Sequence, residues 1–383
     1  LMEEAQAMDV PLYGDFYRCT RNLDAPSIDC LTSLPAQVAW PIARLLSTIA
    51  DLQGSELTMC ETSDHSQRYR PKGDTRPVYV VSEDEIRGTC GKLVLNGINT
   101  ITSYYSYAGL TTTQIQRLNQ WIGRCTTTLR GGHQVTDLAV VYPVESMWPK
   151  FTPGKVRADG APQCQRIEAV YDAVLNGLYQ SGRDMAIIDS RAIAESKVED
   201  GALVHGDLRW RVVVLPAIDT LPQAAWDKLA AFVEAGGVLI AAGARPANSE
   251  GEFPSPAVQA LNQRLFPAAE EPGVAVRPSG GGVVYLPRGA EGMVATVLGG
   301  LLDPDGETGG GNALRTTHRR IGDRDVWFVL NDSAAEVTAT VKLPAVGAGE
   351  QCDPATGTIT AIASGEQQLT LPGYGGMLYR FAG

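Results

Sequence analysis

Residues 57–65 read LTMCETSDH, a short apolar run that ends at Glu61 and continues directly into Thr, Ser, Asp and His. A carboxylate next to a buried strand is costly unless another group pairs with it or uses it. Three further runs have a similar form: VPLYGDFY (10–17), PSIDCLTS (26–33) and NTITSYYS (99–106). We interpret all four as strands whose carboxyl ends carry polar side chains.

Helical patterns separate these strands. Apolar residues recur at intervals of three and four within residues 35–52, 82–97 and 111–129. Strands that alternate with amphipathic helices predict a parallel sheet with crossover helices. In a (β/α)8 barrel the active site lies at the carboxyl edge of the strands. Residues 1–131 are therefore predicted to form half of a (β/α)8 barrel, with four βα units, and we expect the other four units to be absent or supplied by another segment.

Two further domains are predicted after the half barrel. Buried β-branched strands alternate with amphipathic helices across residues 132–303, which indicates a flavodoxin-like, doubly wound α/β domain. The Gly-rich stretch 303–312 is interpreted as a linker. Alternating strands separated by Gly, Pro and Asp then predict a small antiparallel β-sandwich over residues 313–383.

Composition narrows the class of partner. The chain has 383 residues, a formal net charge of −11 and a pI near 5.0, which argue against nucleic acid or an anionic membrane as a partner. No apolar window is long enough for a membrane span, and the N-terminus lacks the form of an export signal. The seven cysteines are scattered without a CxxC pair, so we expect reduced core thiols and a cytoplasmic chain, the alternative being an export signal lost with upstream sequence.

The order of these domains, together with several short motifs, resembles a known group of enzymes. The motifs are YGDFYR, DCLTSLP, MCETSDH, NTITSYYSY, VVYPVESMW, AGGVLIAAG, FVLNDS and CDPATG. The sequence resembles the clan A glycoside hydrolases organised like the family 42 β-galactosidases, with the α-L-rhamnosidase-type hydrolases as a second match. The resemblance implies a retaining, exo-acting glycosidase whose middle domain is glutaminase-like and often mediates trimerisation.

The resemblance also implies a role for Glu61. In clan A enzymes the nucleophilic glutamate ends strand seven, and the run MCETSDH would be that strand if the four units are strands five to eight. The acid/base glutamate, which ends strand four, would then lie upstream of Leu1. Hydrolysis with retention requires both carboxylates. The alternative interpretation of Glu61 is a structural carboxylate in a salt bridge at a strand end.

Other polar residues near the strand ends are candidates for binding a sugar. Asp15 and Arg18 would equally form an ion pair inside the barrel, and His65 is also explained as a loop histidine. Trp148, close to Glu145, would either lean over the barrel mouth or form an interdomain contact. The predicted substrate-binding residues are Asp15, Tyr17, Arg18, Asp29, Ser63, Asp64, His65, Tyr104, Tyr105 and Trp148.

Several other activities are not supported by the sequence. The middle domain has no cysteine on a strand-to-helix elbow, which glutamine amidotransfer requires. The glycine runs lack the context of a nucleotide-binding turn, and no metal ligands have recognisable spacing. We therefore expect no cofactor and no metal, a carbohydrate substrate, and either a homo-oligomer or a complementing N-terminal barrel half. The alternative function is a non-catalytic carbohydrate-binding or oligomerisation protein built on a half barrel.

Overall fold

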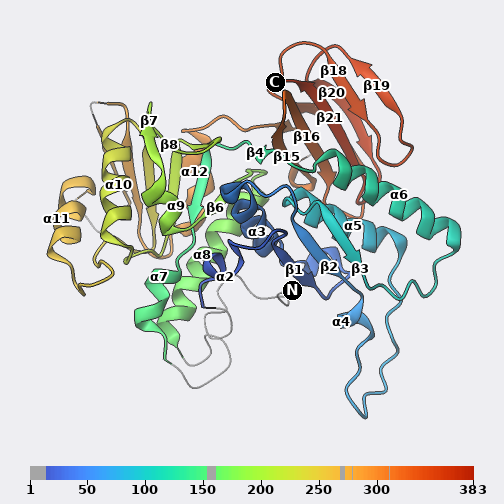
Figure 1. Cartoon of the computed structure of the whole chain (residues 1–383), viewed down its shortest axis with the longest axis horizontal. Helices are drawn as coiled ribbons and strands as arrows, with labels where there is room; N and C mark the ends of the chain where they lie inside the picture. Colours follow the sequence, from blue (N-terminus) through green and yellow to red (C-terminus); the bar gives the residue numbers. More distant parts are fainter. Residues whose placement is uncertain (1–13, 153–160, 268–271, 278, 310) are drawn as a thin grey trace. The chain divides into compact units, whose positions relative to one another are not determined.

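A computed structural model describes residues 14–152, 161–267, 272–277, 279–309 and 311–383. The described chain forms two compact units (Figure 1). Unit 1 comprises residues 20–134 and 304–383, and unit 2 comprises residues 14–19 and 135–303. The predicted half-barrel segment and the predicted C-terminal sandwich thus share one unit, while the division into three domains remains a prediction.

The first half of unit 1 is a small parallel sheet with helices. Its strands are β1 (Ser27–Cys30), β2 (Met59–Thr62) and β3 (Thr100–Ser103), in the order β1-β2-β3. The helices are α3 (Trp40–Gln53), α4 (His65–Arg68), α5 (Glu83–Leu95) and α6 (Thr112–Thr128), with a 3-10 turn at Pro35–Gln37. Capping boxes built on Ser82 and Thr111 start α5 and α6, and Gly54 in the left-handed conformation ends α3.

The prediction of a strand at residues 10–17 is wrong for residues 14–17, which the structure describes. Gly14 has φ +63°, and helix α2 (Phe16–Thr20) begins two residues later. A left-handed residue interrupts an extended strand, which explains the difference. Residues 10–13 lie outside the described part of the chain. The four predicted βα units therefore correspond to three parallel strands among the described residues, and the barrel itself remains a prediction.

The second half of unit 1 is a pair of antiparallel sheets. One sheet has the order β19-β18-β21-β16-β15-β4 and the other β14-β17-β20. Their facing side chains, including Trp327, Val341 and Tyr379, form a buried apolar core. The linker expected at 303–312 contains β14, so part of it belongs to this sandwich. The strands are β4 (His133–Gln134), β14 (Glu307–Thr308), β15 (Leu314–Ile321), β16 (Arg324–Asn331), β17 (Val337–Lys342), β18 (Gly349–Cys352), β19 (Ile359–Ile362), β20 (Glu366–Leu371) and β21 (Gly376–Ala382).

The two halves of unit 1 pack directly on each other. Helix α5 contacts β15 and β16 (Figure 1). The rings of Trp121 in α6 and Phe328 in β16 meet edge to face with centroids 6.3 Å apart. Gly91 lies under Leu330, where a Cβ would come within 2.8 Å of the leucine side chain. This close approach explains a glycine in the middle of α5 despite its cost to the helix.

Unit 2 is a doubly wound sheet. Its strand order is β12-β13-β11-β10-β5-β6, parallel except for the edge strand β12. Apart from β12, this is the order of flavodoxin-like sheets. The strands are β5 (Leu138–Val141), β6 (Ala186–Ile188), β10 (Val212–Pro216), β11 (Val238–Ala242), β12 (Gly273–Val276) and β13 (Gly282–Leu286), and the helices are α7 (Val144–Met147), α8 (Pro162–Gln180), α9 (Ser190–Glu195), α10 (Gln223–Glu234), α11 (Pro256–Leu265) and α12 (Val294–Gly299).

The sequence patterns did not predict every element of unit 2. A small antiparallel sheet of β7 (Lys197–Glu199), β8 (Ala202–His205) and β9 (Leu208–Trp210) lies between β6 and β10 along the chain. Its strands are three or four residues long, too short for a periodic pattern to identify. Across the described residues, no helix has both the length and the apolar character that crossing a membrane requires.

Candidate active site

A row of polar side chains crosses the small parallel sheet of unit 1. Asp29, Glu61 and Thr102 are paired in register across β1, β2 and β3. Residues in register on parallel strands point to the same face of a sheet. All three are partly exposed, whereas Ile28 and Cys60, on the opposite face, are buried. The alternation places Glu61 on the polar face and the apolar positions toward the helices.

Hydrogen bonds fix the loops at the carboxyl ends of β1 and β2. The Ser33 hydroxyl donates to the Ser63 carbonyl at 3.1 Å, and the Ser33 backbone N–H donates to Gln67 Oε1 at 2.8 Å. Gln67 Nε2 in turn donates to Thr32 Oγ1 at 2.9 Å. Ser63 is buried, and its hydroxyl accepts from the His65 N–H at 3.4 Å. Ser63 therefore supports the loop that follows Glu61.

Asp64 connects the loops that follow β2 and β3. Its carboxylate accepts the Ser106 N–H at 3.2 Å and the Ser106 hydroxyl, and the residue is 2% exposed. His65, by contrast, is exposed, and its ring stacks on Tyr69 with centroids 5.3 Å apart. Asp64 is thus a buried connector in this structure, whereas His65 remains accessible to a ligand.

The tyrosines after β3 have different environments. Tyr104 is 61% exposed. Tyr105 is buried in an apolar cluster with Val81, Ile86, Cys90 and Leu118, and this burial raises its pKa well above the usual range. It therefore belongs to the core and does not line the polar face. The sequence alone could not distinguish these two environments, because both tyrosines follow the same strand end.

The remaining predicted binding residues lie in unit 2. Tyr17 is buried, and its hydroxyl donates to the Ile187 carbonyl. Arg18 forms an ion pair with Asp15 at 2.9 Å, and its guanidinium lies 5.6 Å from the centroid of the Trp148 ring. Burial is the largest cause that raises the pKa of Asp15. The structure thus gathers Asp15, Arg18 and Trp148, but in a different unit from Glu61.

Glu145, which lies close to Trp148 in the sequence, has a buried carboxyl group. It follows β5, is 9% exposed and accepts a hydrogen bond from the Ser190 hydroxyl after β6. Its Oε2 atom is buried and has no hydrogen-bond partner within the described part of the chain. Burial raises the pKa of Glu145 to about 7, and the carboxylates of Asp189 and Asp15 add to the effect.

The raised pKa of Glu145 predicts a pH-dependent stability. The folded state favours the neutral form, so ionisation destabilises the protein increasingly as the pH rises from about 4.5 through about 7. We expect Glu145→Gln to raise the free energy of unfolding by about 2 kcal/mol more at pH 8 than at pH 5. Urea unfolding at both values measures this, with Glu195→Gln, an exposed change in α9, as the control. Equal effects of Glu145→Gln at the two pH values would contradict the expectation.

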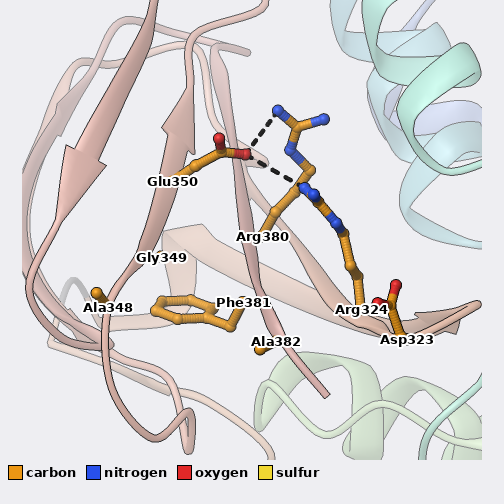
Figure 2. Close-up of a pocket in the computed structure, with 8 residues that line it drawn as sticks. All are labelled: Asp323, Arg324, Ala348, Gly349, Glu350, Arg380, Phe381 and Ala382. Atoms are coloured by element: carbon orange, nitrogen blue, oxygen red, sulfur yellow. Dashed lines mark hydrogen bonds and ion pairs between the residues drawn. The ribbon is translucent and has the colours of Figure 1, made fainter.

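A pocket of about 310 Å³ lies in the C-terminal sandwich (Figure 2). It is lined by residues of β16, β18 and β21 and the adjoining turns, and its charged groups are Asp323, Arg324, Glu350 and Arg380. Glu350 Oε2 lies 2.8 Å from Arg380 and 3.4 Å from Arg324, and Figure 2 shows both guanidinium groups directed at this carboxylate. These charges compensate one another, so the polar row of β1–β3 is the better catalytic candidate.

Metal-binding geometry is missing from the described ranges, where no three His, Cys, Asp or Glu side chains converge as metal ligands would. The described chain thus combines a polar row at the end of a parallel sheet with a doubly wound sheet and a β-sandwich. Residues 98–365 match the α-L-rhamnosidase family of glycoside hydrolases, family 106. The chain belongs to this family.

Solved structures support the fold assignment. A rhamnosidase from a Novosphingobium species matches 96% of this chain and 35% of its own at 18% identity and a TM-score of 0.65. A β-galactosidase from Bacillus circulans sp. alkalophilus matches 96% of this chain and 62% of its own at 15% identity and a TM-score of 0.64. The β-galactosidase of the haloarchaeon Halorubrum lacusprofundi matches the same shares at 13% identity and a TM-score of 0.55.

The comparison with curated proteins found no match. This chain spans less than two thirds of the length of each of the three solved relatives. Together with the family match, these structures confirm the resemblance to clan A glycoside hydrolases. At identities below 20% they show the fold and leave the site residues as predictions.

Proposed function

We propose that this chain supplies Glu61 as the catalytic nucleophile of a retaining, exo-acting glycosidase. The observation that carries the proposal is the row Asp29, Glu61 and Thr102 on one partly exposed face of the parallel sheet. The row lies on the next-to-last residues of the strands, and functional groups in barrel enzymes lie at that edge. The family match favours a terminal α-L-rhamnoside as the substrate, with a β-galactoside as the second candidate.

The chemistry requires Glu61 to reach the anomeric carbon of the terminal sugar. Its carboxylate attacks that carbon, the bond to the leaving oxygen breaks, and a glycosyl ester forms on Glu61. A second carboxyl group, about 5–5.5 Å away, protonates the leaving oxygen and then activates the water that hydrolyses the ester. We predict that this acid/base group comes from a complementing barrel segment, and that Asp29 and Thr102 hydrogen-bond the sugar hydroxyls.

The proposed function is tested with nitrophenyl glycosides and the product anomer. We expect turnover of the α-L-rhamnoside, with the β-galactoside, β-glucoside and α-L-arabinoside as comparisons. Proton NMR of the first-formed sugar is expected to show the same anomeric configuration as the substrate. An inverted product would assign Glu61 to activating water and overturn the nucleophile role. Sugar binding without turnover of any of these glycosides would support the non-catalytic carbohydrate-binding function.

Asp29 offers a second test of the row. Asp29→Asn removes an anionic acceptor for sugar hydroxyls next to Glu61, and hydrogen bonds to charged groups are the stronger ones. We expect kcat/KM to fall roughly tenfold, which corresponds to about 1.4 kcal/mol. Asp24→Asn, an exposed change shortly before β1, is the control and should leave kcat/KM unchanged. Unaltered kcat/KM in Asp29→Asn would remove Asp29 from the site.

A further inference from the structure

A long exposed loop follows the polar row. It runs from Tyr69 to Val80, between α4 and α5, and Figure 1 shows it as a projection beyond α4. Its large side chains are open to solvent: Tyr69 is 58% exposed, Tyr79 48% and Val80 55%. With Arg68, the last residue of α4, we call residues 68–80 the basic loop. Exposed aromatic and aliphatic side chains grouped in one segment are typical of a binding surface.

Internal hydrogen bonds define the shape of the basic loop. The Arg70 guanidinium donates to three carbonyl oxygens: Tyr69 and Pro77 at 2.7 Å and Arg76 at 3.3 Å. Arg76 forms an ion pair with Asp74 at 2.6 Å, and the Tyr79 hydroxyl donates to Glu85 Oε1 of α5 at 2.6 Å. A loop connected in this way loses little conformational entropy when a ligand binds.

The charge of the basic loop is opposite to that of the chain. It carries Arg68, Arg70, Lys72 and Arg76 but a single carboxylate, Asp74, in a protein with a formal net charge of −11. Arg70 and Arg76 are engaged within the loop. The side chains of Arg68 and Lys72 are exposed and make no hydrogen bond or ion pair with any residue that the structure describes. These two cations are therefore available to a ligand.

The loop also adjoins the proposed catalytic carboxylate along the chain. The loop begins shortly after the end of β2 along the chain, and the ring of Tyr69, its first aromatic residue, stacks on His65. Aromatic rings provide flat apolar surfaces that suit the faces of sugar rings. Stacking surfaces and available cations that follow the carboxyl edge of β2 together suit a saccharide that bears negative charge.

We propose that the basic loop binds an anionic saccharide, either carboxylated or sulfated, through Arg68 and Lys72. That this saccharide is the leaving-group portion of the substrate rests on the proposed function, because Glu61 would then act on the terminal sugar linked to the saccharide. The binding itself is independent of hydrolysis. The positive loop attracts the acidic chain, and the negative charge of the rest of the protein repels it elsewhere.

Isothermal titration calorimetry of the full chain carrying Glu61→Gln tests the proposal without turnover. The ligands are an oligogalacturonate, its methyl ester, which has the same sugars without charge, and a sulfated galactan oligosaccharide. We expect the charged ligands to bind at least about tenfold more tightly than the ester at low salt and to lose this advantage in about 0.5 M salt. Preference for carboxylated over sulfated ligand, or the reverse, identifies the charged group.

The matched variants are Arg68→Gln with Lys72→Gln, and Arg21→Gln with Lys342→Gln as a control of equal charge at exposed positions elsewhere in unit 1. The first pair should weaken binding of the charged ligand about tenfold, because two charge-assisted contacts are lost. The control pair should not. Equal affinity for ester and acid, or equal loss in both pairs, would overturn the proposal. So would self-association that depends on Arg68 and Lys72 in place of saccharide binding. If Glu61→Gln kept full activity while anionic binding persisted, only the proposed function would fail.

Discussion

Glu61→Gln is expected to reduce kcat at least about a thousandfold in a preparation that hydrolyses the α-L-rhamnoside, because the neutral amide cannot attack the anomeric carbon. The substitution keeps the size of the side chain and its place in the row with Asp29 and Thr102. KM should change much less than kcat, since hydrogen bonds to the sugar hydroxyls remain. Single-turnover kinetics on the purified variant measures the loss of the chemical step directly.

Glu56→Gln is the matched control for this loss. Glu56 is exposed and lies just before β2, so the same chemical change is made in the same segment without touching the polar row. We expect kcat to stay within about a factor of two of the unaltered protein, since surface substitutions usually have small effects. Wild-type turnover by Glu61→Gln would show that the catalytic carboxylate is another residue.

Asp51→Asn is expected to destabilise unit 1 by about 3–5 kcal/mol, because it removes one partner of a buried ion pair. Asp51 Oδ1 at the end of α3 lies 2.8 Å from Arg319 of β15, and both side chains are nearly inaccessible. Asp51 also accepts the Gln134 N–H at 3.0 Å, and Arg319 donates to the carbonyls of Gly131 and Gly132. The pair therefore joins the parallel sheet region to the sandwich.

Native-state hydrogen exchange measures this effect for each part of unit 1. Amides of α3 and β15 should lose protection together, since the ion pair connects the two elements. Glu350→Gln is the control, because the carboxylate of Glu350 is 40% exposed, and half-exposed pairs contribute about 0–1 kcal/mol. A loss below about 1 kcal/mol for Asp51→Asn would mean that this ion pair contributes little, and that apolar contacts and other polar contacts, such as that of Lys92 with Asp332 at 3.2 Å, hold the two halves of unit 1 together.

The sequence predicted most elements because their patterns are local. The strands at 26–33, 57–62 and 99–106 and the helices between them are confirmed, since apolar periodicity and capping residues determine them. The strand prediction was wrong over residues 14–17, because a left-handed glycine at position 14 and the start of α2 replace the extended conformation there. The contact between α5 and the sandwich was not predictable, because it depends on packing between residues far apart in sequence.

The site was predictable in part. Glu61 and Asp29 were predicted as site residues from the sequence, Glu61 because a carboxylate at the end of an apolar strand is unusual. The register of the strands places the two side by side and adds Thr102, which was not predicted. Asp64 and Tyr105 follow strand ends in the sequence, as neighbouring exposed residues do. They are nevertheless buried, because loops and helices cover them. The hydrogen bond between Asp64 and Ser106 joins residues 42 positions apart, so no local sequence pattern predicts it.

The role of Glu61 as the nucleophile is tested most directly by a crystal structure of the Glu61→Gln protein, together with its complementing barrel segment, bound to a nitrophenyl α-L-rhamnoside. We expect the glutamine amide introduced at position 61 to lie within about 3.5 Å of the anomeric carbon, the distance of a near-attack arrangement. Asp29 and Thr102 should then contact sugar hydroxyls. A rhamnoside bound away from β1–β3, for example in the pocket beside Glu350 and Arg380, would contradict the role of Glu61 as the nucleophile.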